Sequence, residues 1–250
     1  MSKKNLIMVL LTIVVGIGLA YSPVCAKSKP WKKGKRVYYL SLGTSLAAGV
    51  QADPTTGKSV VTDVSYPGFI AESLSEDIPG LRHVNLGCPG ETSDSFIDGG
   101  ICQYQRGSQL DQAIQFLRYN RRSTVLITID MGANDILGCV DLSCVPQGCP
   151  DGVDIDLACF ADVNRNLIAN MIYILKRLRW AAGPRVPIVA MNYYNPLAVF
   201  PAQAEQTNFL QSLINASLEG VYAGFHVPVA DVAGAFMFGD LGLHSQWTWM

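Results

Sequence analysis

Residues 124–135 read Thr124-Val-Leu-Ile-Thr-Ile-Asp-Met-Gly-Ala-Asn-Asp135. The first seven residues form a continuous run rich in β-branched side chains, which predicts a strand that is buried on both faces. Strands of this kind belong to parallel sheets covered by helices, so the run indicates an α/β architecture. In such sheets, ligands bind beyond the carboxyl ends of the strands, which directs attention to the Gly-Ala-Asn-Asp that follows.

The rest of the chain alternates strand and helix patterns around this run. Apolar segments predict strands at 37–42, 81–86, 186–191 and 227–232. Residues repeating with helical spacing predict helices at 66–75, 109–119, 162–180 and 203–222. Together with the strand at 124–130, this order predicts an α/β sandwich around a mostly parallel sheet of five strands.

The N-terminus has the pattern of a signal peptide. Two lysines precede an apolar run, Leu6–Ala20, and Val24 and Ala26 occupy the −3 and −1 positions of a cleavage site. The apolar run is short for a membrane span, which makes an uncleaved anchor helix the less favoured alternative. Residues 1–26 are therefore expected to be a signal peptide, and the mature protein is expected to be secreted or extracytoplasmic.

Composition limits what the remaining chain can be. With 250 residues, 49% hydrophobic residues and a net charge of −1, it is neither an intrinsically disordered chain nor a typical nucleic-acid binder. Residues 27–36 hold six basic side chains. They are expected to form a solvated tail, with a membrane-binding segment as the alternative. Since no repeat or linker follows this tail, residues 37–250 are expected to form one domain.

The cysteines support export. Seven are present, and Cys25 would leave with the signal peptide; it also lacks the small preceding residue of a lipoprotein site. The six that remain predict three disulfides, with Cys88 pairing with Cys102 and the other four pairing among themselves. Zinc is the alternative for the cluster Cys139–Cys159, but its spacing lacks the C-x2-C of structural zinc sites.

Three strand ends carry residues suited to acyl transfer. Ser45 follows the first strand, Gly87 the second, and Asn134 the third. If the first strand lies between the other two, these loops meet at one edge of the sheet. Ser45 would then be the nucleophile, and the Gly87 amide and the Asn134 side chain would donate to the oxyanion. Each residue alone also fits an ordinary turn or cap, so the prediction depends on the combination.

These loops resemble three sequence blocks of the SGNH (GDSL-type) hydrolase family. Gly43-Thr-Ser-Leu46 is similar to the first block, Gly87 to the second, and Gly132-Ala-Asn-Asp135 to the G-x-N-D block, although Thr44 stands where the first block usually has Asp. The resemblance implies a three-layer α/β/α sandwich with a flavodoxin-like sheet and ester hydrolysis through a Ser45 acyl-enzyme. It is greatest to secreted bacterial esterases and lipases. The substrate would be a small-molecule, lipid or carbohydrate ester, with no metal or other cofactor.

The general base is the open part of this prediction. His83 and His226 fall near the starts of predicted strands, away from the expected active edge. His244 lies in the right region with Asp240 as its carboxylate, but three residues separate the two, where the family has D-x-x-H. The base is therefore either His244 with Asp240 or an Asp/His block beyond Met250; the second reading is favoured, and it would leave this version of the chain nearly inactive.

Other functions receive less support. A catalytically silent module of the same fold that binds carbohydrate or lipid is the main alternative to an enzyme. A nucleotide-binding domain is disfavoured because neither G-x-G-x-x-G nor a P-loop follows the first strand. The α/β-hydrolase alternative is disfavoured because the serine motif reads Gly43-x-Ser45-x-Ala47 instead of G-x-S-x-G. The acidic run 151–162 lacks the spacing of an EF-hand calcium loop and is expected to be solvated.

Overall fold

The structure is a computed structural model that describes residues 36–53, 55–56, 58–144, 149, 152–200 and 203–237. The predicted signal peptide, residues 27–35 of the basic tail, and both Asp240 and His244 lie outside the described residues.

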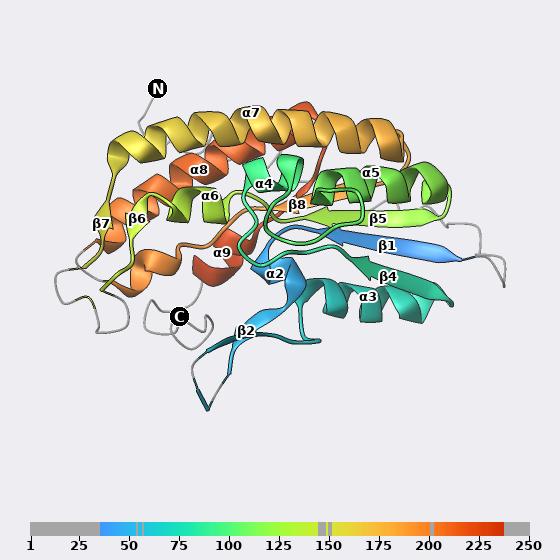
Figure 1. The fold of residues 1–250 in the computed structure, drawn as a ribbon, viewed down its shortest axis with the longest axis horizontal. Helices are drawn as coiled ribbons and strands as arrows, with labels where there is room; N and C mark the ends of the chain where they lie inside the picture. The colour runs from blue at the N-terminus through green and yellow to red at the C-terminus, as the bar shows by residue number, and fades with distance from the viewer. Residues whose placement is uncertain are drawn as a thin grey trace, which may run out of the picture. The chain divides into compact units, whose positions relative to one another are not determined.

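A five-stranded parallel sheet forms the centre of the described chain (Figure 1). Its strands lie in the order β4-β1-β5-β8-β9, and all adjacent pairs are parallel. The bounds are β1 (Val37–Leu42), β4 (Leu81–Asn85), β5 (Thr124–Ile129), β8 (Ile188–Met191) and β9 (Val229–Ala230). The predicted sheet is confirmed, and β1 lies between β4 and β5, as the convergence of the three loops requires.

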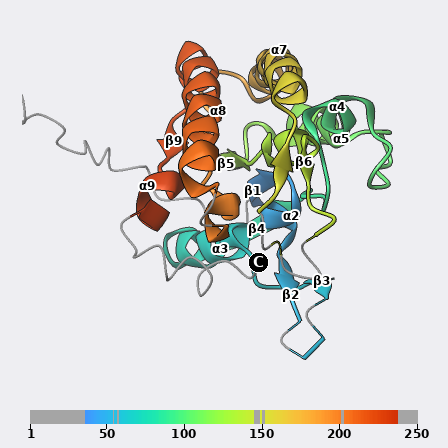
Figure 2. The same cartoon turned by 90° about the vertical axis from the view of Figure 1, so that its left-hand side faces the viewer.

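Helices cover both faces of this sheet and complete a three-layer α/β/α sandwich. The helices α5 (Gln109–Asn120), α7 (Leu157–Ala182) and α8 (Ala204–Gly224) lie on one side, and α3 (Tyr66–Asp77) lies on the other (Figure 2). Helix α5 is capped by Ser108, whose Oγ accepts from the Asp111 N–H at 3.2 Å. Helix α7 begins five residues before its predicted start because Asp156 accepts from two N–H groups of its first turn.

The two faces of β1 and β5 have different chemistry because alternate side chains of a strand point to opposite sides. Leu40, Leu42, Ile127 and Ile129 are buried in an apolar cluster with α5 and α7. The side chains between them are polar. The Tyr39 hydroxyl bonds to Thr128 Oγ1 at 2.7 Å, and Ser41 Oγ lies 2.8 Å from His83 Nε2.

Several short elements fall in segments where the sequence predicted only loops. They are α2 (Ser45–Ala48), the hairpin β2 (Val50–Ala52) and β3 (Ser59–Val61), α4 (Ser93–Asp98), α6 (Ala133–Leu137), the pair β6 (Val140–Asp141) and β7 (Asp154–Ile155), the 3-10 turn η2 (Pro196–Val199) and α9 (Val232–Met237). Each is too short to show a hydrophobic period of its own.

Three disulfides connect these loops. Cys88 pairs with Cys102, Cys139 with Cys159, and Cys144 with Cys149. The predicted grouping is confirmed and leaves none of these six thiols free for zinc. Among the described helices, none has the length and apolar character needed to cross a bilayer.

Candidate active site

The three predicted loops meet at the carboxyl edge of the sheet. Ser45 is the first residue of α2, directly after β1, and Asn134 lies in α6, directly after β5. Both side chains line one cavity of about 800 Å³. Gly87, after β4, packs against α2 so closely that a Cβ on it would lie 2.6 Å from the Ala48 nitrogen. The structure therefore brings Ser45 and Asn134 to one cavity, whereas Gly87 contacts Ala47 and Ala48 at the end of α2 and is not among the residues that line that cavity.

The turn that presents Ser45 is fixed at Gly43 by a buried glutamine. The Gly43 N–H donates to Gln109 Oε1 at 2.7 Å, and Gln109 Nε2 donates back to the Gly43 carbonyl at 3.0 Å. The Cys88 N–H also donates to this carbonyl, at 3.0 Å, which joins the turn to the loop that carries Gly87. Both polar backbone groups of Gly43 are thus occupied, as buried groups must be.

The same turn is fixed at Thr44 by a buried carboxylate. Asp130 Oδ1 accepts from the Thr44 N–H at 2.8 Å and from Thr44 Oγ1 at 2.6 Å. The Tyr66 hydroxyl of α3 donates to Oδ2 at 2.8 Å. Burial raises the pKa of Asp130 to about 6, although the hydrogen bonds from Thr44, Tyr66 and Ala47 lower it.

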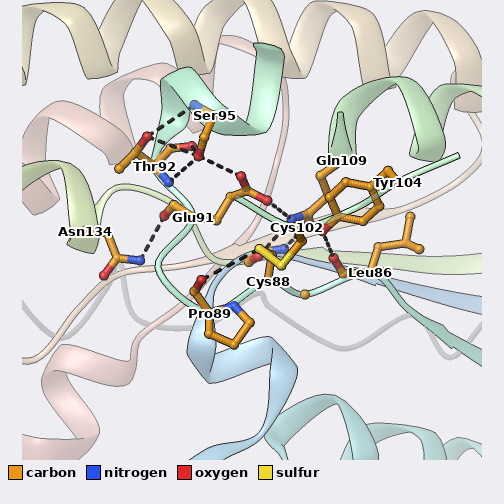
Figure 3. The surroundings of a disulfide bond; sticks show 12 residues. Leu86, Cys88, Pro89, Glu91, Thr92, Ser95, Cys102, Tyr104, Gln109 and Asn134 are labelled. Carbon is orange, nitrogen blue, oxygen red and sulfur yellow. Dashed lines mark hydrogen bonds between the residues drawn. A yellow bond between two sulfur atoms is a disulfide. The ribbon is translucent and has the colours of Figure 1, made fainter. Parts of the chain in front are cut away.

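Asn134 is oriented by the loop after β4. Its Nδ2 donates to the Glu91 carbonyl at 2.9 Å, and Figure 3 shows this contact beside the Cys88–Cys102 disulfide. A primary amide has two N–H groups, so the second can donate to a ligand in the cavity. The neighbouring Asp135 has a structural role, because it accepts from the Ser93 N–H at 3.0 Å at the start of α4.

Gly87 presents its N–H to a protein acceptor in this structure. That N–H donates to Asn85 Oδ1 at 2.9 Å, and Asn85 Nδ2 donates to the Ala47 carbonyl in α2 at 2.7 Å. Asn85 therefore bridges α2 and the Gly87 loop. A ligand oxygen that binds the Gly87 N–H has to compete with this side chain.

Glu91 connects the three loops through its two ends, a role that sequence reasoning missed. Its side chain is 1% exposed, and it accepts from Gln109 Nε2 at 2.8 Å and from Ser95 Oγ at 2.6 Å, while its carbonyl holds Asn134. Figure 3 shows these contacts together. In the sequence, an acidic residue after Pro89-Gly90 looks like a residue of a solvated surface loop. Its buried partners come together only in the folded protein, so no local pattern identifies it.

Neither histidine of the described residues reaches Ser45. His83 bonds to Ser41 and stacks on Tyr39 with ring centroids 4.8 Å apart. Ser41 is completely buried, so this Ser–His pair is closed to a substrate carbonyl. Burial lowers the pKa of His83. His226 precedes β9 and so lies toward the opposite edge of the sheet.

Metal ligands do not gather in the part of the chain that the structure describes. Within those residues, no group of three or more His, Cys, Asp or Glu side chains is arranged to hold an ion.

Residues of the loops after β1 and β5 thus line one cavity at the carboxyl edge of a parallel sheet, which is where α/β folds bind their ligands. Residues 41–248 match the GDSL-like lipase/acylhydrolase family. The chain belongs to this family and is a carboxylic ester hydrolase of the GDSL type.

Solved structures share the fold at low sequence identity. An extracellular lipase from Streptomyces rimosus is 21% identical, with a TM-score of 0.56, over 80% of this chain and 82% of that chain. Phospholipase A1 from Streptomyces albidoflavus is 18% identical, with a TM-score of 0.52, over 81% and 82%. A carbohydrate acetylesterase from Sinorhizobium meliloti is 13% identical, with a TM-score of 0.50, over 80% and 85%. No curated protein matches the chain.

Proposed function

We propose that the protein is a secreted esterase that acts through an acyl-enzyme on Ser45. Ser45 Oγ attacks the ester carbonyl carbon while a general base takes its proton. The tetrahedral oxyanion collapses, and the alcohol leaves with the proton returned by the base. Water then attacks the acyl-enzyme in the same way and releases the acid, which regenerates Ser45.

The observation that carries this proposal is the shared cavity of Ser45 and Asn134. A partly exposed serine at a helix start opens there onto apolar walls, and an amide that uses one N–H to hold the Glu91 carbonyl lines the same cavity. Exclusion of water by such walls strengthens hydrogen bonds to a developing negative charge. Asn134 is therefore proposed as one oxyanion donor.

Gly87 is proposed as the second oxyanion donor. Its N–H belongs to the loop packed on α2, and a Cβ at this position would collide with Ala47 and Ala48. In the reaction, the oxyanion would replace Asn85 Oδ1 as the acceptor of this N–H. The oxyanion carries more charge than an amide oxygen, which favours this exchange in the transition state.

The general base is proposed to come from beyond the described residues. His83 is bonded to Ser41, and His226 lies toward the far edge of the sheet. The two candidates from the sequence are therefore retained: His244 with Asp240, or an Asp/His pair beyond Met250. His244→Ala separates them, because it abolishes turnover only if His244 is the base.

The cavity walls favour an apolar acyl group. The residues around Ser45 include Leu46, Val50, Phe69, Ile136 and Leu137. Burial of hydrocarbon contributes about 0.8 kcal/mol per CH₂, so walls of this kind select for acyl-chain length. A lipid or other small-molecule ester with an apolar acyl chain fits this lining better than a sugar acetate.

Export is the cellular setting proposed for this activity. Three disulfides persist only in an oxidising compartment, and the pattern of residues 1–26 is that of a cleaved signal peptide. Sequencing the N-terminus of the exported protein tests this, with Lys27 expected as the first residue.

Ser45→Ala tests the function, with Ser41→Ala as its matched control. Ser45→Ala is expected to abolish hydrolysis of a short-chain aryl ester, because it removes the only nucleophile proposed. Ser41→Ala removes a neighbouring serine that is hydrogen-bonded to a histidine but buried, and it is expected to keep kcat within about two-fold. Equal activity of wild type and Ser45→Ala would contradict the proposal. Ligand binding without turnover by the chain with its base in place would indicate the silent binding module instead.

A further inference from the structure

We infer that Asp130 is a positioning residue for Ser45. Its carboxylate accepts hydrogen bonds from the N–H and the hydroxyl of Thr44, and these contacts fix the position from which Ser45 attacks. This inference rests on the proposed nucleophile.

Asp130 reaches the nucleophile turn from a different strand. It directly follows β5 and is 86 residues from Thr44, yet one of its oxygens accepts both polar groups of Thr44 at 2.8 and 2.6 Å. The second oxygen is held by the Tyr66 hydroxyl of α3 at 2.8 Å. With these donors, the backbone N–H of Ala47 as a further one, and no exposure to solvent, the carboxylate has one fixed orientation.

The residue before Thr44 shows how close this approach is. Gly43 has φ of 137°, and a Cβ on it would overlap the Asp130 carboxyl group. Only glycine combines this backbone angle with such an approach. The turn is thus shaped to lie directly on the carboxylate.

The turn is held from two sides just before Ser45. Gln109 occupies both polar groups of Gly43, and Asp130 occupies the N–H of Thr44. Ser45 begins α2 immediately afterwards, so its Cα position follows from these contacts. Displacement of a reacting group by about 1 Å can reduce the rate by about 100-fold, which makes this support relevant to turnover.

In the described part of the chain, the titratable groups that interact with the charge of Asp130 are tyrosines. Tyr39 of β1 and Tyr66 of α3 interact with its charge, as do Tyr193 after β8 and Tyr222 of α8. Tyrosine hydroxyls stay protonated and uncharged at neutral pH, and the one that bonds to Asp130, that of Tyr66, is a donor. The holding of Thr44 therefore depends on acceptor geometry and not on an ion pair.

Asp130→Ala and Asp130→Asn together test this inference. Alanine removes the acceptor, and kcat is expected to fall at least ten-fold with KM within two-fold, because the apolar cavity is unchanged. Asparagine keeps an oxygen for Thr44 and an NH₂ that can donate to the Tyr66 oxygen. It is therefore expected to retain at least a third of the wild-type kcat. The rate of labelling by an organophosphonate should follow kcat in both variants.

A control that lowers stability without touching Thr44 separates positioning from folding. Tyr39→Phe removes a buried hydrogen bond on the same sheet face and is expected to lower the melting temperature while leaving kcat within two-fold. The inference is overturned if Asp130→Ala keeps kcat within two-fold, if asparagine is as damaging as alanine, or if Tyr39→Phe loses as much kcat.

Thr44→Val provides a second test if Asp130→Ala does not fold. It removes Oγ1, which donates to Asp130 at 2.6 Å and also accepts from the Leu46 N–H at 3.5 Å as the cap of α2. Because it keeps the Thr44 N–H and the side-chain shape, kcat is expected to fall three- to ten-fold; an unchanged kcat also overturns the inference. The Ser45→Ala result keeps the two proposals apart. An active Ser45→Ala refutes the nucleophile itself, whereas an inactive Ser45→Ala with a fully active Asp130→Ala refutes only the positioning role.

Discussion

The two faces of β1 and β5 are built from alternate residues of the same short segments, but they do different work. Leu40, Leu42, Ile127 and Ile129 face α5 and α7 and lie in the apolar cluster. The opposite face carries Tyr39, Ser41 and Thr128. Asp130 follows Thr128 by two residues, just beyond the end of β5, and holds the turn before Ser45. The apolar face therefore supplies most of the free energy of folding, whereas the site depends on a single group of the polar face, the Asp130 carboxylate.

The largest expected effect is on the apolar face. Ile127→Ala leaves a cavity in a fully buried position. It is expected to lower the free energy of unfolding by about 2–5 kcal/mol, which urea titration measures. The kcat of the folded fraction should stay within about two-fold. A large loss of kcat in fully folded Ile127→Ala would contradict the claim that the apolar face contributes to stability and not to turnover.

The next effect is on the site. Asn134→Ala removes a proposed oxyanion donor and is expected to lower kcat by about 100- to 1000-fold, with a small change in KM. The measurement is steady-state hydrolysis of an aryl ester, and Asp94→Ala is the control. Asp94 accepts from Asn170 in an exposed contact and should keep kcat. An Asn134→Ala variant with normal kcat would remove Asn134 from the oxyanion site.

The pH dependence of stability sharpens the role of the polar face. The pKa of Asp130 is raised to about 6 in the folded state from an unfolded value of 3.8. Between these values the folded state binds more protons, so this group makes the protein less stable as pH rises from about 4 to about 6. The amide of Asp130→Asn does not titrate. As pH rises over this range, the unfolding free energy of the wild type is therefore expected to fall relative to that of Asp130→Asn. A constant difference would contradict the burial of the charge.

The smallest expected change in stability comes from the loss of a single buried hydrogen bond on the polar face. Tyr39→Phe removes the hydroxyl that bonds to Thr128. It is expected to lower the free energy of unfolding by about 0.5–1.5 kcal/mol, because one buried hydrogen bond is lost. Thermal unfolding measures this change, and a loss as large as that of Ile127→Ala would mean that both faces contribute equally to stability.

The sequence predicts the apolar face well and the polar face poorly. Long periodic segments such as 109–119 identify their own buried side, so the helices and the five strands could be read directly. Ser45, Gly87 and Asn134 could be selected because each follows a strand. The positions of Asp130, Glu91 and Gln109 in the site depend on contacts 18 to 86 residues apart. No local pattern contains such contacts, although an acidic residue at the end of a buried strand was a usable signal for Asp130.

The most direct test of the account is the position of the covalent adduct formed by an organophosphonate. Ser45 and Ser41 lie four residues apart, and only Ser41 bonds to a histidine among the described residues. Tandem mass spectrometry of the labelled protein, in a form that carries its base, is predicted to place the phosphonate on Ser45 and to find none in Ser45→Ala. An adduct on Ser41, or on any other residue in place of Ser45, would contradict the account.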